Sequence, residues 1–314
     1  MTLLLLGCGL GLLAIPTLAR PLGRRLPPSE WAKACAGLLA FGWVVVEASL
    51  LLQAAPTLLR TAGLERLAEL CEHVLGPVAP GGPVLGVVAG GTATAVALLA
   101  TRSLRAARHR QRLGTVEPGV GWHATVGGHE LVVLPSGEPV AFSTAGRPGQ
   151  VVLSHGLVAA LSDRELAAVL RHEVAHVQHR HRRYLLLARA VERSLGLLPG
   201  VRGATAALRC ALERWADEEA AGGNATSRAS VHAALLRLAE LAATPEVAAF
   251  TTPGTVAERL DALEADPTGG RAVGRRTLVY GPAGLLLGAA AVTLGGILAQ
   301  VSVLHALAGL CPPH

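Results

Sequence analysis

Charged side chains are scarce in this chain. They make up 16% of its 314 residues, against about 25% in ordinary soluble domains. Aromatic residues are only 3%, so the 51% of hydrophobic residues consists mainly of leucine, alanine and valine. Lysine is nearly absent as well, and arginine supplies the formal net charge of +6. Because long uncharged runs carry the apolar excess, the composition indicates a bilayer environment rather than a large globular core.

Paired cysteines are also lacking. The five cysteines lie far apart and include no C-x-x-C pair: Cys8, Cys35, Cys71, Cys210 and Cys311. This spacing excludes a cysteine-based metal knuckle and provides no obvious disulfide framework.

Four apolar stretches are each close to the roughly 20 residues that a bilayer core requires. They cover about 2–19, 34–55, 78–101 and 278–305. Arginines follow the first stretch directly, and further arginines follow the third at 102–112. By the positive-inside rule, the first loop and the central segment are cytoplasmic and the N-terminus lies outside. We therefore expect a multi-pass protein of a bacterial cell membrane.

The arginine-rich segment 102–112 lies directly after a predicted span and has no interleaved aromatic residues. It favours contact with anionic lipid over binding of nucleic acid. The partners that we expect are the lipid bilayer and a protein substrate, with no nucleic acid. The sequence does not define the oligomeric state, nor the role of Glu47 inside the second span.

The chain divides into three parts. Residues 1–112 hold three transmembrane helices and the arginine-rich segment, 113–270 form a cytoplasmic domain, and 271–314 hold the fourth transmembrane helix and a short tail. The fold class is a mainly α membrane protein with an α+β domain between helices three and four. In that domain, 129–134 and 139–143 flank a Pro-Ser-Gly-Glu turn, which predicts a β-hairpin, and 150–154 form a further short strand.

Helices follow these strands. Ser162 and Glu165 form a capping box, so a helix begins there, and we expect it to continue to about His181 because no glycine or proline interrupts it. A second helix covers about 201–221 and ends at a Gly-Gly-Asn cluster. Two more are expected at 228–243 and 255–265.

The capped helix carries the sequence His172-Glu173-Val174-Ala175-His176. A spacing of four residues advances about 400°, so both imidazoles leave one face of the helix. Two zinc ligands need this arrangement, and Glu173 lies beside them to hold a water molecule. The motif occurs by chance in roughly 1% of chains of this length, and it could be the polar face of a histidine-rich stretch. The apolar neighbours favour a partly buried site, where a metal ion would satisfy these groups.

Catalytic zinc usually has three protein ligands and a water molecule. Glu213 is the candidate third ligand, and Asp217 lies one helical turn after it. Asp217 would accept the free N–H of a ligating histidine and fix its tautomer. The alternative is that these two residues, with Glu218 and Glu219, form a solvated acidic face. We predict one zinc ion per chain.

The segment Leu161–His181, which reads LSDRELAAVLRHEVAHVQHRH, resembles the core of gluzincin membrane proteases, and an E-x-x-A-D helix follows it as in that group. The group includes the HtpX and CAAX prenyl protease branch and the BlaR/MecR antirepressor branch. The resemblance covers about 141–221. It implies a zincin-like fold and a zinc-dependent endopeptidase, with His172, His176 and Glu213 as zinc ligands, Glu173 as catalytic base and Asp217 as support.

One departure concerns the HtpX branch, which has a downstream His-Pro segment followed by an arginine. Here Thr252-Pro253 and then Arg259 stand in that region. The histidine is missing, and Arg259 is a candidate for transition-state or structural support. This departure, together with three spans before the domain and one after it, favours the antirepressor branch.

The antirepressor branch implies a regulatory, repressor-type substrate. An HtpX-type quality-control protease is the alternative, and so is a catalytically silent membrane transducer or scaffold with a zinc site. The antirepressor branch also carries a sensor domain after its last span. Only 311–314 follow the last apolar run here, so we expect any stimulus to arrive through a separate sensor partner.

Overall fold

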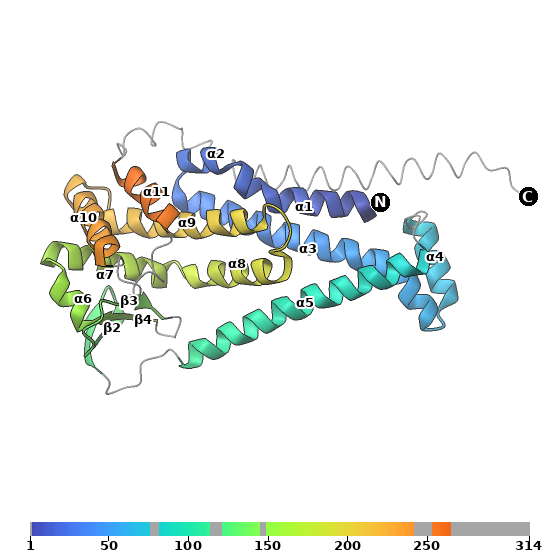
Figure 1. Ribbon diagram of the computed structural model, residues 1–314, viewed down its shortest axis with the longest axis horizontal. Helices are drawn as coiled ribbons and strands as arrows, with labels where there is room; N and C mark the ends of the chain where they lie inside the picture. Colours follow the sequence, from blue (N-terminus) through green and yellow to red (C-terminus); the bar gives the residue numbers. More distant parts are fainter. Residues whose placement is uncertain (1, 76–81, 114–120, 145–148, 242–252, 265–314) are drawn as a thin grey trace, which may run out of the picture.

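The computed structural model describes residues 2–75, 82–113, 121–144, 149–241 and 253–264 (Figure 1). The fold is mainly helical, with one small β-sheet gathered at one end of the molecule. The predicted fourth span, 278–305, lies outside the described residues, as does the tail that follows it.

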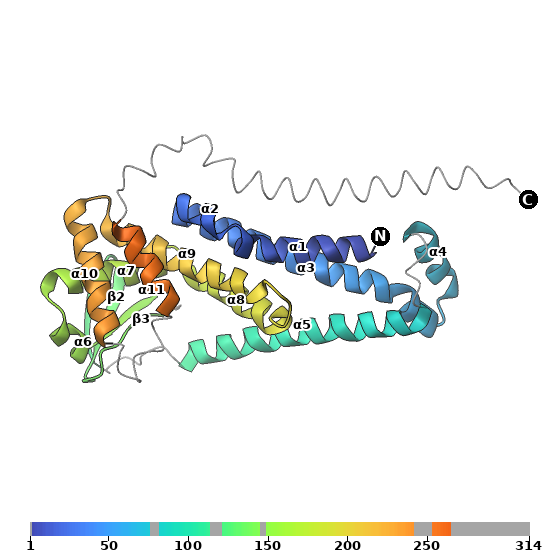
Figure 2. The same ribbon diagram turned by 45° about the horizontal axis from the view of Figure 1, so that its top comes forward.

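Three apolar helices run along the length of the molecule: α1 (Thr2–Leu18), α3 (Pro28–Thr61) and α5 (Gly82–Leu113) (Figures 1 and 2). By length and composition α3 and α5 could each cross a membrane, whereas α1 is a shorter apolar helix. α5 continues through the arginine-rich segment without a break. Two further helices occupy the predicted loops, α2 (Arg20–Arg25) and α4 (Glu65–Leu75).

The sheet has four strands in the order β1-β2-β4-β3: β1 (Trp122–Val126), β2 (His129–Leu134), β4 (Gln150–Ser154) and β3 (Ala141–Ser143). β1 and β2 are antiparallel and join through Gly127 and Gly128, whose φ angles of 55° and 77° suit a tight hairpin. β2 and β4 are parallel, and β3 is antiparallel to β4. β3 is therefore an edge strand.

The predicted hairpin between 129–134 and 139–143 is wrong, because β4 lies between β2 and β3. The Pro-Ser-Gly-Glu turn carries the chain across the end of β4 instead. There the Ser136 carbonyl oxygen accepts a hydrogen bond of 2.8 Å from the Gly156 N–H, at the start of α6 (His155–Ala160). A true hairpin joins β1 and β2, and β1 was not among the strands expected from the sequence.

Helix α7 (Asp163–Gln178) begins at the predicted capping box, in which the Glu165 carboxylate accepts a 2.8 Å hydrogen bond from the Ser162 N–H. The helix ends three residues before the predicted His181. Arg180 has a left-handed φ of 54°, and α8 (His181–Leu195) starts after it as a separate helix. Left-handed backbone is costly for a residue other than glycine, so such a break usually falls at a glycine. Arginine occupies the position here, and the local sequence therefore does not mark the break.

The remaining helices agree with the prediction to within about three residues. They are α9 (Val201–Ala221), α10 (Ala225–Leu241) and α11 (Pro253–Glu264). α9 ends at Gly222, whose φ of 56° is the left-handed C-cap that the Gly-Gly-Asn cluster predicted.

The α8–α9 hairpin joins the sheet end of the molecule to the long apolar helices. α9 packs on α1 and α3, and α8 packs on α5 (Figures 1 and 2). At the hairpin tip, the Thr17 hydroxyl donates a 2.8 Å hydrogen bond to the Gly200 carbonyl oxygen. Buried residues of these helices form one continuous core, which includes Leu13, Trp31, Leu39, Val46, Val96, Val191, Leu208 and Leu212.

A second core lies between the sheet and α7, α9 and α10. Its buried members include Leu131, Val151, Leu153, Leu157, Val169, Val174, Ala220, Val231 and Leu235. α7 and α9 pack directly on one another beside this core. The two helices that carry the metal-binding candidates are thereby held at a fixed distance.

Close packing of α1 on α3 gives a test of the fold. A Cβ atom at Gly9 would lie 2.8 Å from Cγ2 of Val46 and 3.0 Å from its backbone nitrogen, whereas one at Gly11 meets nothing within 4 Å. We expect Gly9→Ala to destabilise the protein by about 1–3 kcal/mol through overpacking. Gly11→Ala, in the same helix, should leave stability unchanged or raise it by up to about 1 kcal/mol, because alanine favours the helix and meets no neighbour there. Thermal denaturation in detergent measures both, and equal midpoints would contradict this contact.

Candidate metal centre

His172 and His176 leave α7 on one face and turn the same ring atom toward a common point. Their Nε2 atoms lie 3.1 Å apart, close enough for both to reach one ion. Both side chains are mostly buried, with 14% and 13% of their surface exposed. The helical spacing in the sequence predicted this shared face.

Glu213 reaches the same point from α9. One carboxylate oxygen lies 3.4 Å from His172 Nε2 and the other lies 3.6 Å from His176 Nε2. Ligand atoms about 2.0–2.2 Å from a tetrahedral zinc ion lie roughly 3.3–3.5 Å from each other. The measured distances are close to that separation, so the three side chains are placed to hold a zinc ion. Within the described chain they form a cluster whose ligand atoms all lie within 4.8 Å of one another.

Asp217 lies one turn after Glu213 on α9 and orients the first histidine. Its Oδ1 atom is 2.9 Å from His172 Nδ1, the ring atom that faces away from the metal position. Only 3% of the Asp217 side chain is exposed. Arg259 of α11 donates two hydrogen bonds of 2.7 Å to the same carboxylate, and its Nη1 lies 3.3 Å from Glu213. α7, α9 and α11 thus meet at one buried charge network.

The charges of this network suit a metal site. Burial alone would raise the pKa of Glu213, but His176, His172 and Arg259 outweigh burial and hold the pKa well below its usual value. Glu213 is therefore ionised at neutral pH, as a ligand must be. Burial would likewise lower the pKa of His172, but hydrogen bonds with Asp217 and Glu213 raise it to about 10. A metal ion must displace this proton when it binds.

His181 completes the surroundings of the second histidine, a role that was not expected from the sequence. Its Nδ1 lies 2.8 Å from Nδ1 of His176, and the residue is fully buried. If Nε2 of His176 faces the metal, its Nδ1 carries a proton, and the lone pair of His181 Nδ1 is placed to accept it. Burial first, and then the nearby histidines, lower the pKa of His181 to about 3, so that the ring is neutral.

His181 reaches this position because α7 breaks before it. In a continuous helix, five residues advance about 500°, which would turn His181 roughly 140° away from His176. The side chain of Trp215 on α9 then packs on the His181 ring, with centroids 4.7 Å apart. The histidine-rich stretch was the only sequence signal for this contact.

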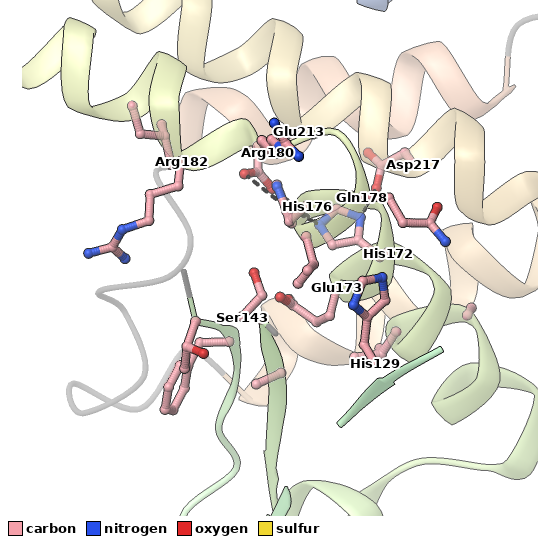
Figure 3. Close-up of a pocket in the computed structure, with 18 of the residues that line it drawn as sticks. His129, Ser143, His172, Glu173, His176, Gln178, Arg180, Arg182, Glu213 and Asp217 are labelled. Atoms are coloured by element: carbon pink, nitrogen blue, oxygen red, sulfur yellow. Dashed lines mark hydrogen bonds and ion pairs between the residues drawn. The ribbon is translucent and has the colours of Figure 1, made fainter. Parts of the chain in front are cut away.

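Glu173 lies on the open side of the site. Figure 3 shows its carboxylate pointing toward Ser143 of the edge strand β3. Both line a cavity of about 1080 Å³ that also contains the three candidate ligands, Asp217 and Arg259.

The model of Peptidase family M48 matches residues 108–281. The chain belongs to this family. No curated protein and no solved structure matches the chain. M48 peptidases are zinc-dependent metallopeptidases, so the family agrees with the zinc peptidase that the motif indicated. The match also spans the described sheet and the helices α6 to α11.

A second contact ties this M48 domain to the N-terminal helices. Glu258 precedes Arg259 on α11, and its carboxylate pairs with Arg24 of α2 at 2.9 Å. Cys210 of α9 donates to the other oxygen of Glu258 at 3.1 Å. The loop between the first two apolar helices therefore touches the short helix that carries the arginine of the metal centre.

The contact of His181 predicts a measurable effect on metal affinity. His181→Leu removes the acceptor and leaves the His176 N–H buried without a partner, so zinc affinity should fall about 10–100-fold. His181→Asn should retain most of the affinity, because its side-chain oxygen can occupy the place of Nδ1. Competition with a chromogenic chelator measures the dissociation constants.

His179→Asn is the matched control. The His179 ring also packs on Trp215, with centroids 4.6 Å apart, but its Nε2 contacts Glu219 instead of a candidate ligand. The zinc affinity of the His179→Asn variant should stay within about twofold of that of the parent protein. Wild-type affinity in a folded His181→Leu variant would remove His181 from the support of the site.

Proposed function

We propose that this protein is a membrane-bound zinc endopeptidase that cleaves a cytoplasmic or membrane-associated protein. The main observation in support is that His172, His176 and Glu213 converge on one point. Glu173 lies beside them in an open cavity. Membership of the M48 peptidases supports the reaction class. The class of substrate is inferred from the proposed position of the cavity, on the cytoplasmic side and close to the membrane.

Each nearby side chain has a role in this proposal. A bound zinc ion would acidify a water molecule and polarise the carbonyl of the scissile peptide bond. Glu173 accepts the proton of that water and later delivers it to the leaving nitrogen. Asp217 keeps His172 in the tautomer that presents Nε2, and Arg259 neutralises Asp217 and can stabilise charge on the substrate oxygen.

The edge strand β3 supports a position for the substrate. Its outer edge has no strand partner in the described sheet, and β3 lines the cavity beside Glu173. An extended peptide that pairs with this edge gains main-chain hydrogen bonds and presents its backbone to the base. This arrangement favours unfolded or flexible segments over folded proteins.

The proposed topology has four spans, with the N-terminus outside and the M48 domain in the cytoplasm. α3 and α5 have the length and composition for two of these spans. The arginines that follow α1 and those in the second half of α5 support the orientation. The hairpin α8–α9 packs on α1, α3 and α5, so the cavity would open close to the membrane surface.

We further propose that the substrate is a regulatory, repressor-type protein, as in the antirepressor branch of the gluzincins. Quality control of many misfolded membrane proteins is the alternative. A catalytically silent scaffold is disfavoured because the base, the three candidate ligands and their hydrogen-bond partners are all in place.

Substitution of Glu173 separates catalysis from metal binding. Glu173→Gln should abolish peptide cleavage and retain one zinc ion per chain, because Glu173 provides a base and no metal bond. Glu213→Gln should lose both, since it removes a charged ligand from the triad. Metal analysis and a peptide cleavage assay on the purified proteins distinguish these results. Equal zinc content in both variants would exclude Glu213 as a ligand.

The Glu173→Gln variant also discriminates between the biological roles. The Glu173→Gln variant is expected to bind zinc and peptide without cleaving the peptide. It should therefore retain its substrate in native membranes. Recovery of one soluble protein supports regulation, whereas recovery of many membrane proteins supports quality control.

Thiol labelling tests the topology. In a variant whose native cysteines are serines, a cysteine at Gly137 should resist an impermeant maleimide in intact cells, and a cysteine at Glu69 should react. Both positions are exposed in the structure, so burial does not explain a difference. Permeabilised cells should label both. The reverse pattern would place the M48 domain outside the membrane.

A further inference from the structure

Four arginines line the cavity on the side of α8, away from the sheet: Arg180, Arg182, Arg183 and Arg189. On α8, Arg182 and Arg189 are two turns apart, so they lie on the same face of the helix. In Figure 3, Arg182 extends on the opposite side of the metal-centre residues from His129. The cavity thus has a metal centre in the middle and a cationic wall at one side.

The charges at the metal centre balance without these arginines. Glu173, Glu213 and Asp217 are the cavity's carboxylates, and Arg259 with a divalent ion would offset all three. Arg180, Arg183 and Arg189 therefore give the loaded cavity a net positive charge. Clefts lined by one sign of charge concentrate ligands of the opposite sign.

Three of these arginines, Arg180, Arg183 and Arg189, lack acidic neighbours in the part of the chain that the structure describes. None of its carboxylates lies within 4.0 Å of Arg180, Arg183 or Arg189, and all three side chains are exposed. Arg182 is partly buried, and burial together with repulsion from Arg189 lowers its pKa. Clustered cations of this kind repel one another unless an anion joins them.

The path of a peptide along β3 leads past this wall. Phe142 and Ser143 of β3 and the next residue, Thr144, line the cavity, and the arginines line the same cavity. An extended segment spans about 3.3 Å per residue, so a few residues reach beyond the metal centre. Side chains on that part of the substrate would meet the guanidinium groups, which bind carboxylates in pairs of hydrogen bonds.

We propose that Arg180, Arg183 and Arg189 form a substrate subsite that selects acidic peptide segments, with Asp or Glu side chains flanking the cleaved bond. The inference rests on the proposed peptidase function and adds the class of substrate. A phospholipid headgroup carries the same type of charge. We favour the peptide because the arginines share one cavity with Glu173 and the metal triad, where a resident lipid would obstruct the reaction.

A binding experiment tests the subsite without requiring catalysis. The probes are two fluorescein-labelled peptides that differ only in having glutamate or glutamine at the same positions. The protein is the full chain with Glu173→Gln, loaded with zinc, in nanodiscs of neutral phosphatidylcholine. Fluorescence anisotropy should give roughly tenfold tighter binding of the glutamate peptide, and the difference should shrink at high salt.

The double variant Arg183→Gln/Arg189→Gln should remove this preference and leave the affinity for the glutamine peptide within about twofold. Arg193→Gln is the matched control, because Arg193 is exposed on the same helix but does not line the cavity. It should retain the full preference. Parallel cleavage assays with Glu173 restored test the peptidase function separately.

Equal binding of the two peptides by the parent protein would overturn the proposal, and so would equal loss of preference in the control. A second set of nanodiscs that contain phosphatidylglycerol tests the lipid alternative. If the double variant binds less of this lipid than the parent protein and keeps its peptide preference, the wall is a lipid site and the proposal is wrong. Failure to cleave any peptide, with the glutamate preference intact, would count against the peptidase function and leave the acidic subsite standing.

Discussion

The buried carboxylate of Asp217 is the interaction on which the site depends. It accepts hydrogen bonds from His172 on α7 and from Arg259 on α11, and it belongs to α9 itself. A carboxylate with 3% of its surface exposed requires such partners, because an unpaired buried charge costs about 3–5 kcal/mol. The same contacts that satisfy Asp217 therefore hold three helices at the spacing that lets His172, His176 and Glu213 converge.

The helix α9 also joins the metal centre to the apolar part of the molecule. Its first half packs on α1 and α3, and its second half carries Glu213 and Asp217. Within α11, Glu258 contacts Arg24 of α2, and the next residue, Arg259, contacts Asp217. Two sets of contacts thus link the N-terminal helices to the metal centre. The peptidase domain and its proposed membrane anchor share one hydrophobic core.

Local patterns in the sequence were sufficient where the interaction is local. The capping box at Ser162 and the glycine after α9 specified helix ends, and apolar length specified α3 and α5. Strand pairing was predicted wrongly, because a turn sequence does not exclude the insertion of a later strand between its two flanks. The break at Arg180 was missed since the left-handed residue there is not glycine, and packing of α8 on α5 and α9 holds it instead.

The sequence by itself determined the chemistry of the centre: two histidines one turn apart, a glutamate beside the first, and a Glu–Asp pair on a second helix. Only the tertiary structure decided which groups surround them. His181 turns to His176 because the chain bends between them, and Arg259 reaches Asp217 across 42 residues of sequence. The cavity-lining arginines at the start of α8 and along it likewise form one wall of the cavity because α8 packs on α5 and α9. Periodicity fixes relations within a helix, whereas the relations between helices follow from the core that they bury together.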